Sequence, residues 1–192
     1  MSENQMREAI LVAARDLFFE KGIRGTSMRD IAGAVGLAQS SLYNHFGSKE
    51  ELARAVMERS FELVDGAVRK VFADQPPSLD LLRRALYEHA MQHVHGIKET
   101  AVFQLERRHM PPSVRDRVIE LRGIYEERFQ ELAEKLAEAG CITRNETRTR
   151  MRILLSAGRE LGSWFRPGGR LSEHDVATIY ADLGLAALRP ES

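Results

Sequence analysis

Polar side chains that both donate and accept hydrogen bonds cluster between residues 39 and 45; they are Gln39, Ser40, Ser41, Tyr43, Asn44 and His45. Read as a helix, this segment keeps Leu42 and Phe46 on a separate apolar face. A glutamine amide can pair bidentately with adenine, serine is less selective, and such groups also bind phosphate oxygens. The segment therefore predicts noncovalent recognition of double-stranded DNA.

Local signals place this segment as the second helix of a helix-turn-helix. Ser27 and Asp30 form a capping-box-like start for the helix before it, and Gly36 ends that helix because a left-handed residue favours glycine. Ser48 with Glu51 then forms an S-x-x-E box that opens a long third helix. Two helices joined by a short glycine-containing turn define the motif, and its second helix meets base edges in the major groove.

Composition limits the alternatives. The 192 residues are 43% hydrophobic, enough for one or two helical domains. A formal net charge of zero argues against a strongly basic protein that coats DNA without sequence preference. It allows a sequence-specific DNA-binding protein with a few well-placed cationic side chains. Cys141 is the only cysteine, which suits a reducing cytosol. No apolar run approaches the roughly 20 residues that span a bilayer, and the first ten residues lack a signal-peptide core. We expect a cytoplasmic protein without membrane contact.

Helical periodicity and breaks predict an all-α chain of about nine helices. The first runs over 5–21, two short helices follow before residue 47, and later ones are expected over 48–73, 78–95, 100–108, 113–139, 145–165 and 172–188. Asn145 is expected to cap the penultimate helix. The pattern divides the chain into a headpiece over 1–47 and a larger helical domain over 48–192.

One run in the headpiece is unusually specific: L-Y-x-H-F-x-S-K-E-E-L at Leu42–Leu52. Together with Ala14, Phe18, Gly22, Thr26, Ile31, Ala32, Val35 and Gly36, it resembles the TetR family of bacterial transcriptional regulators. The resemblance implies a DNA-binding domain over 1–47 and an effector-binding and dimerisation domain over 48–192. It also implies a ligand-responsive regulator that binds a palindromic operator as a homodimer, with repression as the family default.

The resemblance also implies roles for individual residues. Gln39, Ser40 and Ser41 are expected to read bases, while Asn44 and His45 could touch bases or backbone. Phosphate contacts are expected from Thr26, Ser27, Arg29, Tyr43 and Lys49. Ala38 stands where a capping Ser or Thr would be expected, which costs about 1 kcal/mol of helix cap. The alternative is a three-helix bundle with a merely polar surface.

Small residues at one-turn spacing in 157–162 and apolar residues in the last helix predict a self-pairing face. The expected interface residues are Leu154, Gly158, Leu161, Gly162, Ile179 and Leu183. Ordinary packing within one chain is the alternative explanation for the small residues.

His89 and His93 lie four residues apart on one helical face. This spacing could chelate a metal, contact an effector or serve packing; no acidic or cysteine partner falls in register, so no metal site is expected. The full set expected to bind a small-molecule effector is Phe61, Val64, Val68, His89, His93, Phe103, Arg159 and Trp164. The aromatic members could equally be core residues.

The run Trp164-Phe-Arg-Pro-Gly-Gly169 resembles a TetR branch that includes steroid-catabolism repressors released by a coenzyme-A thioester. Leu155, Arg159 and Ser163 stand where that branch has polar and aromatic ligand contacts. We therefore expect a small hydrophobic or acyl-CoA-type effector rather than a steroid-derived one.

Two other functions compete with this interpretation. The chain has no G-x-S-x-G, H-E-x-x-H or phosphate loop, so no catalytic residues and no cofactor are expected. The remaining alternative is a helical adaptor or structural protein without a ligand response.

Overall fold

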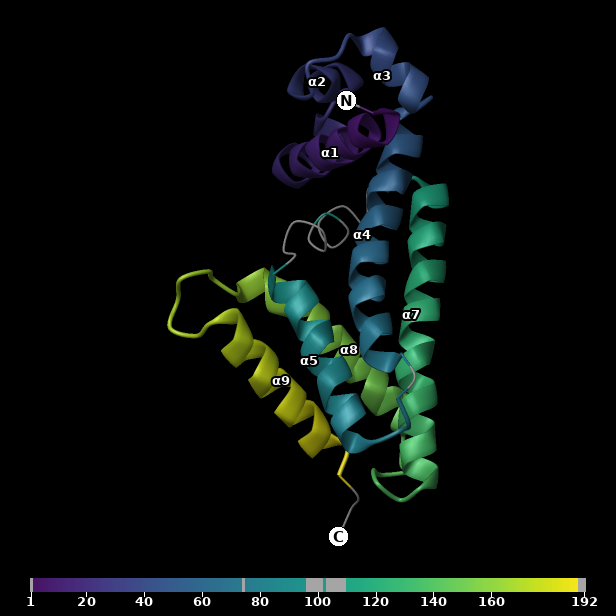
Figure 1. Ribbon diagram of the computed structural model, residues 1–192, viewed down its shortest axis with the longest axis vertical. Helices are drawn as coiled ribbons and strands as arrows, with labels where there is room; N and C mark the ends of the chain where they lie inside the picture. The colour runs from purple at the N-terminus through teal and green to yellow at the C-terminus, as the bar shows by residue number, and fades with distance from the viewer. Residues whose placement is uncertain (1, 74, 96–101, 103–109, 190–192) are drawn as a thin grey trace. The chain divides into compact units, whose positions relative to one another are not determined.

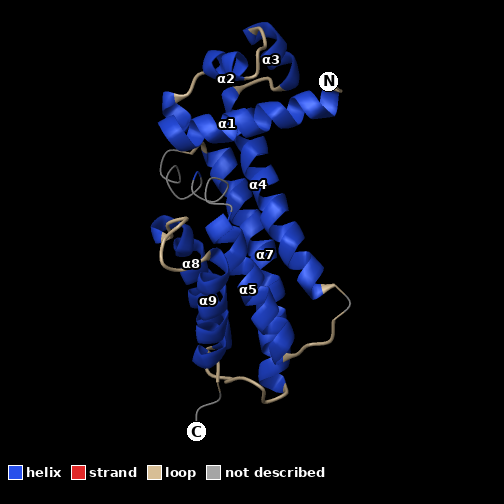
Figure 2. Cartoon of the chain, turned by 60° about the vertical axis from the view of Figure 1, so that its left-hand side comes forward, coloured by secondary structure: helices blue, strands red, loops and turns tan. Residues whose placement is uncertain are grey.

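The computed structural model describes residues 2–73, 75–95, 102 and 110–189. Regular structure in these residues is helical (Figure 2), which confirms the all-α prediction. The helices are α1 Glu3–Gly25, α2 Met28–Ala34, α3 Gln39–His45, α4 Lys49–Phe72, α5 Leu79–His95, α7 Pro112–Glu138, α8 Thr147–Trp164 and α9 Glu173–Ala187. The short helix expected over 100–108 lies outside the described residues, apart from Val102. None of the described helices combines the length and apolar composition of a membrane-spanning segment.

The chain forms two compact units. The first comprises Met1–Phe61 and Lys98–Leu121, and the second comprises Glu62–Ile97 and Arg122–Ser192. Both α4 and α7 therefore contribute residues to each unit.

The first unit begins its helices as the local sequence predicts. Ser27 caps α2 and forms a reciprocal capping box with Asp30, whose backbone N–H lies 3.1 Å from the serine Oγ. Gly36 adopts a φ of 68° after α2, the left-handed conformation expected at that turn. The core beneath is apolar and includes the fully buried side chains Ile10, Ile31, Leu42, Phe46 and Leu52.

The start of α8 corrects one prediction. Asn145 does not cap this helix; Glu146 occupies the N-cap in a left-handed conformation, with a φ of 56° and no side-chain hydrogen bond to the helix. The reason is the turn that precedes it, in which Asn145 donates its backbone N–H to the Thr143 hydroxyl at 3.2 Å. Thr147 then donates its own hydroxyl to the Thr143 carbonyl at 3.0 Å.

In the second unit α5, α8 and α9 lie side by side (Figure 1) around an apolar core. The packing is tight at Gly158 on α8, where a Cβ would lie 2.4 Å from two atoms of the His89 ring on α5. Real Cβ atoms do not come this close, so α8 packs on α5 at this distance only with glycine there.

This contact generates a stability prediction. Gly158→Ala should lower the free energy of unfolding by about 1–3 kcal/mol, because the added methyl must displace the buried His89 ring. The control is Gly123→Ala on α7, where a Cβ meets nothing within 4 Å. That change should leave stability unchanged or raise it by up to ~1 kcal/mol, since alanine favours a helix. Urea denaturation measures both, and equal stability of the two variants would contradict the packing described.

Candidate DNA-binding surface and effector site

Helix α3 turns its polar residues outward. Leu42 and Phe46 are fully buried, which fixes the orientation of the helix. On the other side Gln39, Ser40 and Asn44 are exposed, and Tyr43 is 44% exposed. The two other residues predicted to contact DNA on this helix, Ser41 and His45, are half-buried. The structure thus exposes Gln39 and Ser40, two of the three predicted base readers, on the same helix as exposed Tyr43 and Asn44.

Few interactions within helix α3 stabilise it. It has seven residues, and Ala38 at its N-cap makes no side-chain hydrogen bond, as expected from the sequence. So short a helix is unstable alone, so tertiary contacts must hold it. Arg7 of α1 supplies one of them: its Nη1 donates to the His45 carbonyl at 3.1 Å, and its guanidinium carbon lies 4.2 Å from the centre of the Phe46 ring. No local sequence signal identified Arg7, since it lies 38 residues from its partner.

Lys49 is engaged inside the first unit. Its Nζ donates to the carbonyls of Ile23 and Thr26, both at 2.9 Å. These bonds tie the first turn of α4 to the connection between α1 and α2. The geometry therefore assigns Lys49 a positioning role, whereas the sequence predicted a phosphate contact.

Thr26 corrects a second prediction. Its side chain is 1% exposed, and its hydroxyl donates to the Gly22 carbonyl at 2.9 Å. A hydroxyl buried in this way cannot reach a phosphate, so Thr26 is a packing residue. Ser27 and Arg29, the other two residues predicted at the start of α2, are exposed. The Ser27 hydroxyl donates to Asp30 Oδ2 at 2.7 Å and lowers the pKa of that carboxyl.

His89, one of the residues predicted to bind an effector, is buried in the second unit with both ring nitrogens hydrogen-bonded. His89 is fully buried, with Nδ1 2.7 Å from the Tyr125 hydroxyl and Nε2 3.1 Å from the Leu155 carbonyl. A carbonyl only accepts, so Nε2 carries the proton and Nδ1 accepts from Tyr125. Burial lowers the pKa of His89 to about 3, so the ring is neutral at physiological pH.

His93, one turn further along α5, is also buried. Its ring meets His89 edge-on, with centroids 4.7 Å apart and an interplanar angle of 74°. Burial, then the neighbouring His89, Arg159 and Arg122, lower its pKa well below the usual value. Its Nδ1 has no hydrogen-bond partner among the described residues.

The other residues predicted to bind an effector do not lie together. Val68 is buried in the second unit's core, with Val64 packed against it. Arg159 donates to Glu126 at 3.0 Å and to the Ser156 hydroxyl at 2.6 Å. Two of the predicted residues lie apart from the buried residues of the second unit. Trp164 is 54% exposed, and Phe61 packs with the core of the first unit. Phe103 lies outside the described residues.

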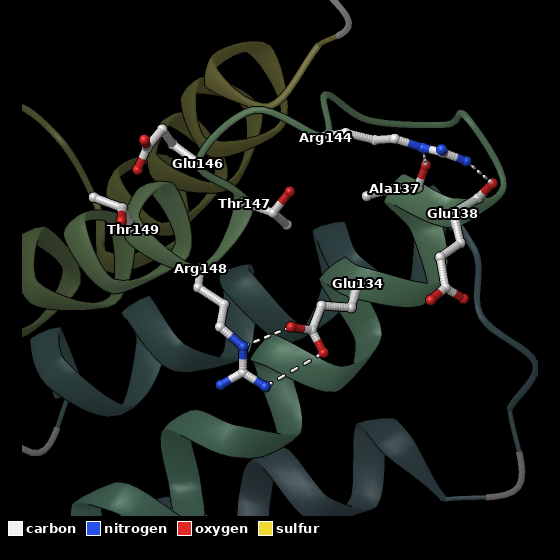
Figure 3. Close-up of a pocket in the computed structure, with 8 residues that line it drawn as sticks. All are labelled: Glu134, Ala137, Glu138, Arg144, Glu146, Thr147, Arg148 and Thr149. Carbon is white, nitrogen blue, oxygen red and sulfur yellow. Dashed lines mark hydrogen bonds and ion pairs between the residues drawn. The ribbon is translucent and has the colours of Figure 1, made fainter.

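A surface pocket of about 670 Å³ lies elsewhere in the second unit (Figure 3). It is lined by Glu134, Ala137, Glu138, Arg144, Glu146, Thr147, Arg148 and Thr149, none of which was predicted to bind an effector. Its arginines are engaged within the protein. Arg148 pairs with Glu134 and Glu127, and Arg144 donates to the Ala137 and Glu138 carbonyls. The charge of Arg148 is therefore compensated by two carboxylates, whereas Arg144 is held by neutral backbone carbonyls.

The predicted pairing face is partly exposed. Ile179 and Leu183 on α9 are 47% and 64% exposed, while Leu154 and Gly162 are half-buried. Gly158 faces His89 of its own chain and Leu161 is buried in the second unit's core, so both residues serve packing within the chain, and their part in pairing stays a prediction. Sequence reasoning missed the exposed Ile153, which shares a face of α8 with Trp164 at helical spacing.

Comparison with known proteins identifies the family. Residues 75–188 match the model described as "Tetracyclin repressor-like, C-terminal domain", and residues 10–56 match "Bacterial regulatory proteins, tetR family". The chain belongs to the TetR family of DNA-binding transcriptional regulators.

Relatives cover nearly the whole chain. The transcriptional repressor KstR2 of Rhodococcus jostii is 29% identical over 187 residues, 95% of this chain and 90% of the relative. The crystal structure of PfmR, a TetR family regulator from Thermus thermophilus, is 31% identical with a TM-score of 0.81, covering 92% of this chain and 97% of that one. AibR, solved with isovaleryl coenzyme A and operator DNA, has a TM-score of 0.83 at 24% identity, covering 97% of this chain and 100% of that one. At that identity, AibR supports the fold alone.

The geometry of Lys49 generates a second prediction. Lys49→Met should lower the free energy of unfolding by about 1–2 kcal/mol in the absence of DNA, because two hydrogen bonds from a charged group to carbonyls are lost. Lys21→Met removes one exposed charge from the same unit and should change stability by less than about 0.5 kcal/mol. Thermal unfolding of both variants measures this. Wild-type stability of Lys49→Met would return this residue to the phosphate role predicted from the sequence.

Proposed function

We propose that the protein is a ligand-responsive repressor that binds a near-palindromic operator as a homodimer and is released by a small hydrophobic or acyl-CoA-type effector. The observation that carries the proposal is the exposed polar face of α3 above buried Leu42 and Phe46, in a chain of the TetR family. The named function of KstR2 supports repression. We assign DNA binding to residues 1–47, effector binding and dimerisation to residues 48–192, and the site of action to the cytoplasm.

Recognition of the operator rests on a small contact set. Gln39 supplies the most selective group, because its amide can pair bidentately with adenine. Ser40, Ser41 and Asn44 add weaker contacts, and the Tyr43 hydroxyl donates to a phosphate. With a net charge of zero, the protein has little nonspecific attraction for DNA, so affinity depends on correct placement of this set in two copies.

Base reading is tested by gel shift with DNA from just upstream of the gene. Gln39→Ala should weaken operator binding by roughly 5–150-fold and relax the preference at one A·T pair. Tyr43→Phe should weaken binding to all sequences alike, since a phosphate contact carries no sequence information.

The matched control is Gln75→Ala, which removes the same amide from an exposed connection between α4 and α5. It should bind as the wild type does. Unchanged binding by Gln39→Ala would remove Gln39 from the reading set. A wild-type protein that binds no DNA from this region would favour the adaptor alternative.

Dimerisation rests on the exposed apolar residues of α8 and α9, among them Ile153, Ile179 and Leu183. Two headpieces related by a two-fold axis read half-sites about one helical turn apart, roughly 34–36 Å.

Leu183→Glu tests this face, because pairing would bury its charge against the same residues of the partner. The variant should be a monomer by light scattering at micromolar concentration, where the wild type is a dimer. Ile119→Glu on α7, at a residue 57% exposed, is the control and should remain a dimer. A monomeric wild type, or a dimeric Leu183→Glu, would contradict the proposed interface.

The acyl-CoA class of effector follows from the resemblance of Trp164–Gly169 to the branch released by coenzyme-A thioesters; AibR, a protein of the same fold, was solved with isovaleryl coenzyme A. Release from DNA then follows from a population shift, in which the effector binds the conformation unsuited to the operator more tightly. The buried polar residues of the second unit are the groups available to recognise it.

A further inference from the structure

His93 is a buried polar side chain in the second unit. The residue is 6% exposed, and its Nδ1 has no hydrogen-bond partner among the described residues. Nearly all buried polar atoms in folded proteins are paired, because an unpaired one loses its bonds to water without replacement. An atom left in this state is a cost to stability that a bound ligand could offset.

The neighbouring His89 shows the contrast. Both of its ring nitrogens are paired, to Tyr125 and to Leu155, and its ring is locked against Gly158. His89 therefore has no capacity for a further hydrogen bond from its ring and acts as a structural support. The edge-on contact between the two rings holds His93 in place while leaving its Nδ1 without a partner among the described residues.

We infer that His93 Nδ1 is the hydrogen-bond donor for the acyl carbonyl of the effector. This inference rests on the proposed function and specifies one contact within it. The neutral ring can carry its proton on Nδ1, and a carbonyl oxygen accepts from that N–H. The acyl carbonyl would then be the only polar group of the acyl chain to enter the core, and it would accept a hydrogen bond from His93 there.

Burial at His93 favours a thioester over a free carboxylate. Both histidines are neutral, because burial lowers each pKa below its usual value. The nearby Arg159 is already paired with Glu126 at 3.0 Å, so its charge is compensated. A carboxylate would lose its hydration on entering this core, at a large cost in free energy. A thioester carbonyl is uncharged and needs only the hydrogen bond.

The first test measures stability without ligand. His93→Leu replaces the polar ring, whose Nδ1 has no partner among the described residues, with an apolar side chain and should raise Tm by about 2–8 °C. His93→Asn keeps an amide donor near the position of Nδ1 and should not raise it. His95→Leu is the control on the same helix; His95 has a 77% exposed side chain, and its loss should move Tm by less than about 2 °C.

The second test measures ligand response through the change in Tm of the full-length protein. The probes are a panel of acyl-CoA thioesters that includes isovaleryl-CoA, with isovalerate and free coenzyme A as references. The thioester that stabilises the wild type should bind His93→Leu roughly 5–150-fold more weakly, because its carbonyl loses the donor. His93→Asn and His95→Leu should retain the response.

The outcomes separate the inference from the proposed function. A thioester that stabilises wild type and His93→Leu equally overturns the role of His93 and leaves the effector class standing. A fall in Tm of several degrees for ligand-free His93→Leu also overturns it, because Nδ1 would then be satisfied in the folded protein, for example by an ordered water. If no thioester stabilises the wild type, the acyl-CoA class and the carbonyl contact both fail. Loss of the response in His93→Leu alone, with retention in His93→Asn, supports the inference.

Discussion

The recognition helix α3 must be rigid, yet its seven residues and uncapped start give it almost no stability of its own. The first unit supplies that stability from outside the helix. Leu42 and Phe46 anchor it from below, and Arg7 holds its last carbonyl while covering the Phe46 ring. Lys49 fixes the following helix to the turn before α2. These contacts leave the outward face of α3 free to meet a ligand, and because the protein carries no net charge, recognition there depends on geometry.

The second unit is organised around a different constraint, the contact between α5 and α8. The absence of a side chain at Gly158 lets the His89 ring lie against the α8 backbone, where it donates to the Leu155 carbonyl. Tyr125 completes the pair from α7. His89, with both ring nitrogens paired, thus packs against His93, whose Nδ1 has no hydrogen-bond partner among the described residues. Proteins accept such a loss of stability mainly where a buried polar group has a task, and ligand recognition is the task we assign to it.

Local features of the fold could be predicted from the sequence because short-range bonds determine them. Ser27 with Asp30 forms the capping box that its spacing indicates, and the Glu51 backbone N–H donates to the Ser48 hydroxyl at 3.0 Å, as the S-x-x-E spacing predicts. The helical spacing of Leu42 and Phe46 likewise identified the buried side of α3.

Features that depend on distant neighbours could not be predicted. The sequence predicts Thr26 as an exposed hydroxyl at the start of α2, but the folded first unit buries it. The family resemblance implies a phosphate contact for Lys49, but its ammonium group donates to two backbone carbonyls of the same unit. Gly158 is a small residue suited to either a partner or its own chain, and only the position of His89 decides between them. Arg7 has no pattern at all, because its partners lie on another helix.

The central claim is that the polar face of α3 reads DNA in two copies. Footprinting of the wild-type protein on the DNA upstream of its gene tests this most directly. The account predicts one protected, near-palindromic region whose half-sites are centred about one helical turn, or a multiple of it, apart. No protection at micromolar protein, or protection without two-fold symmetry, would contradict it.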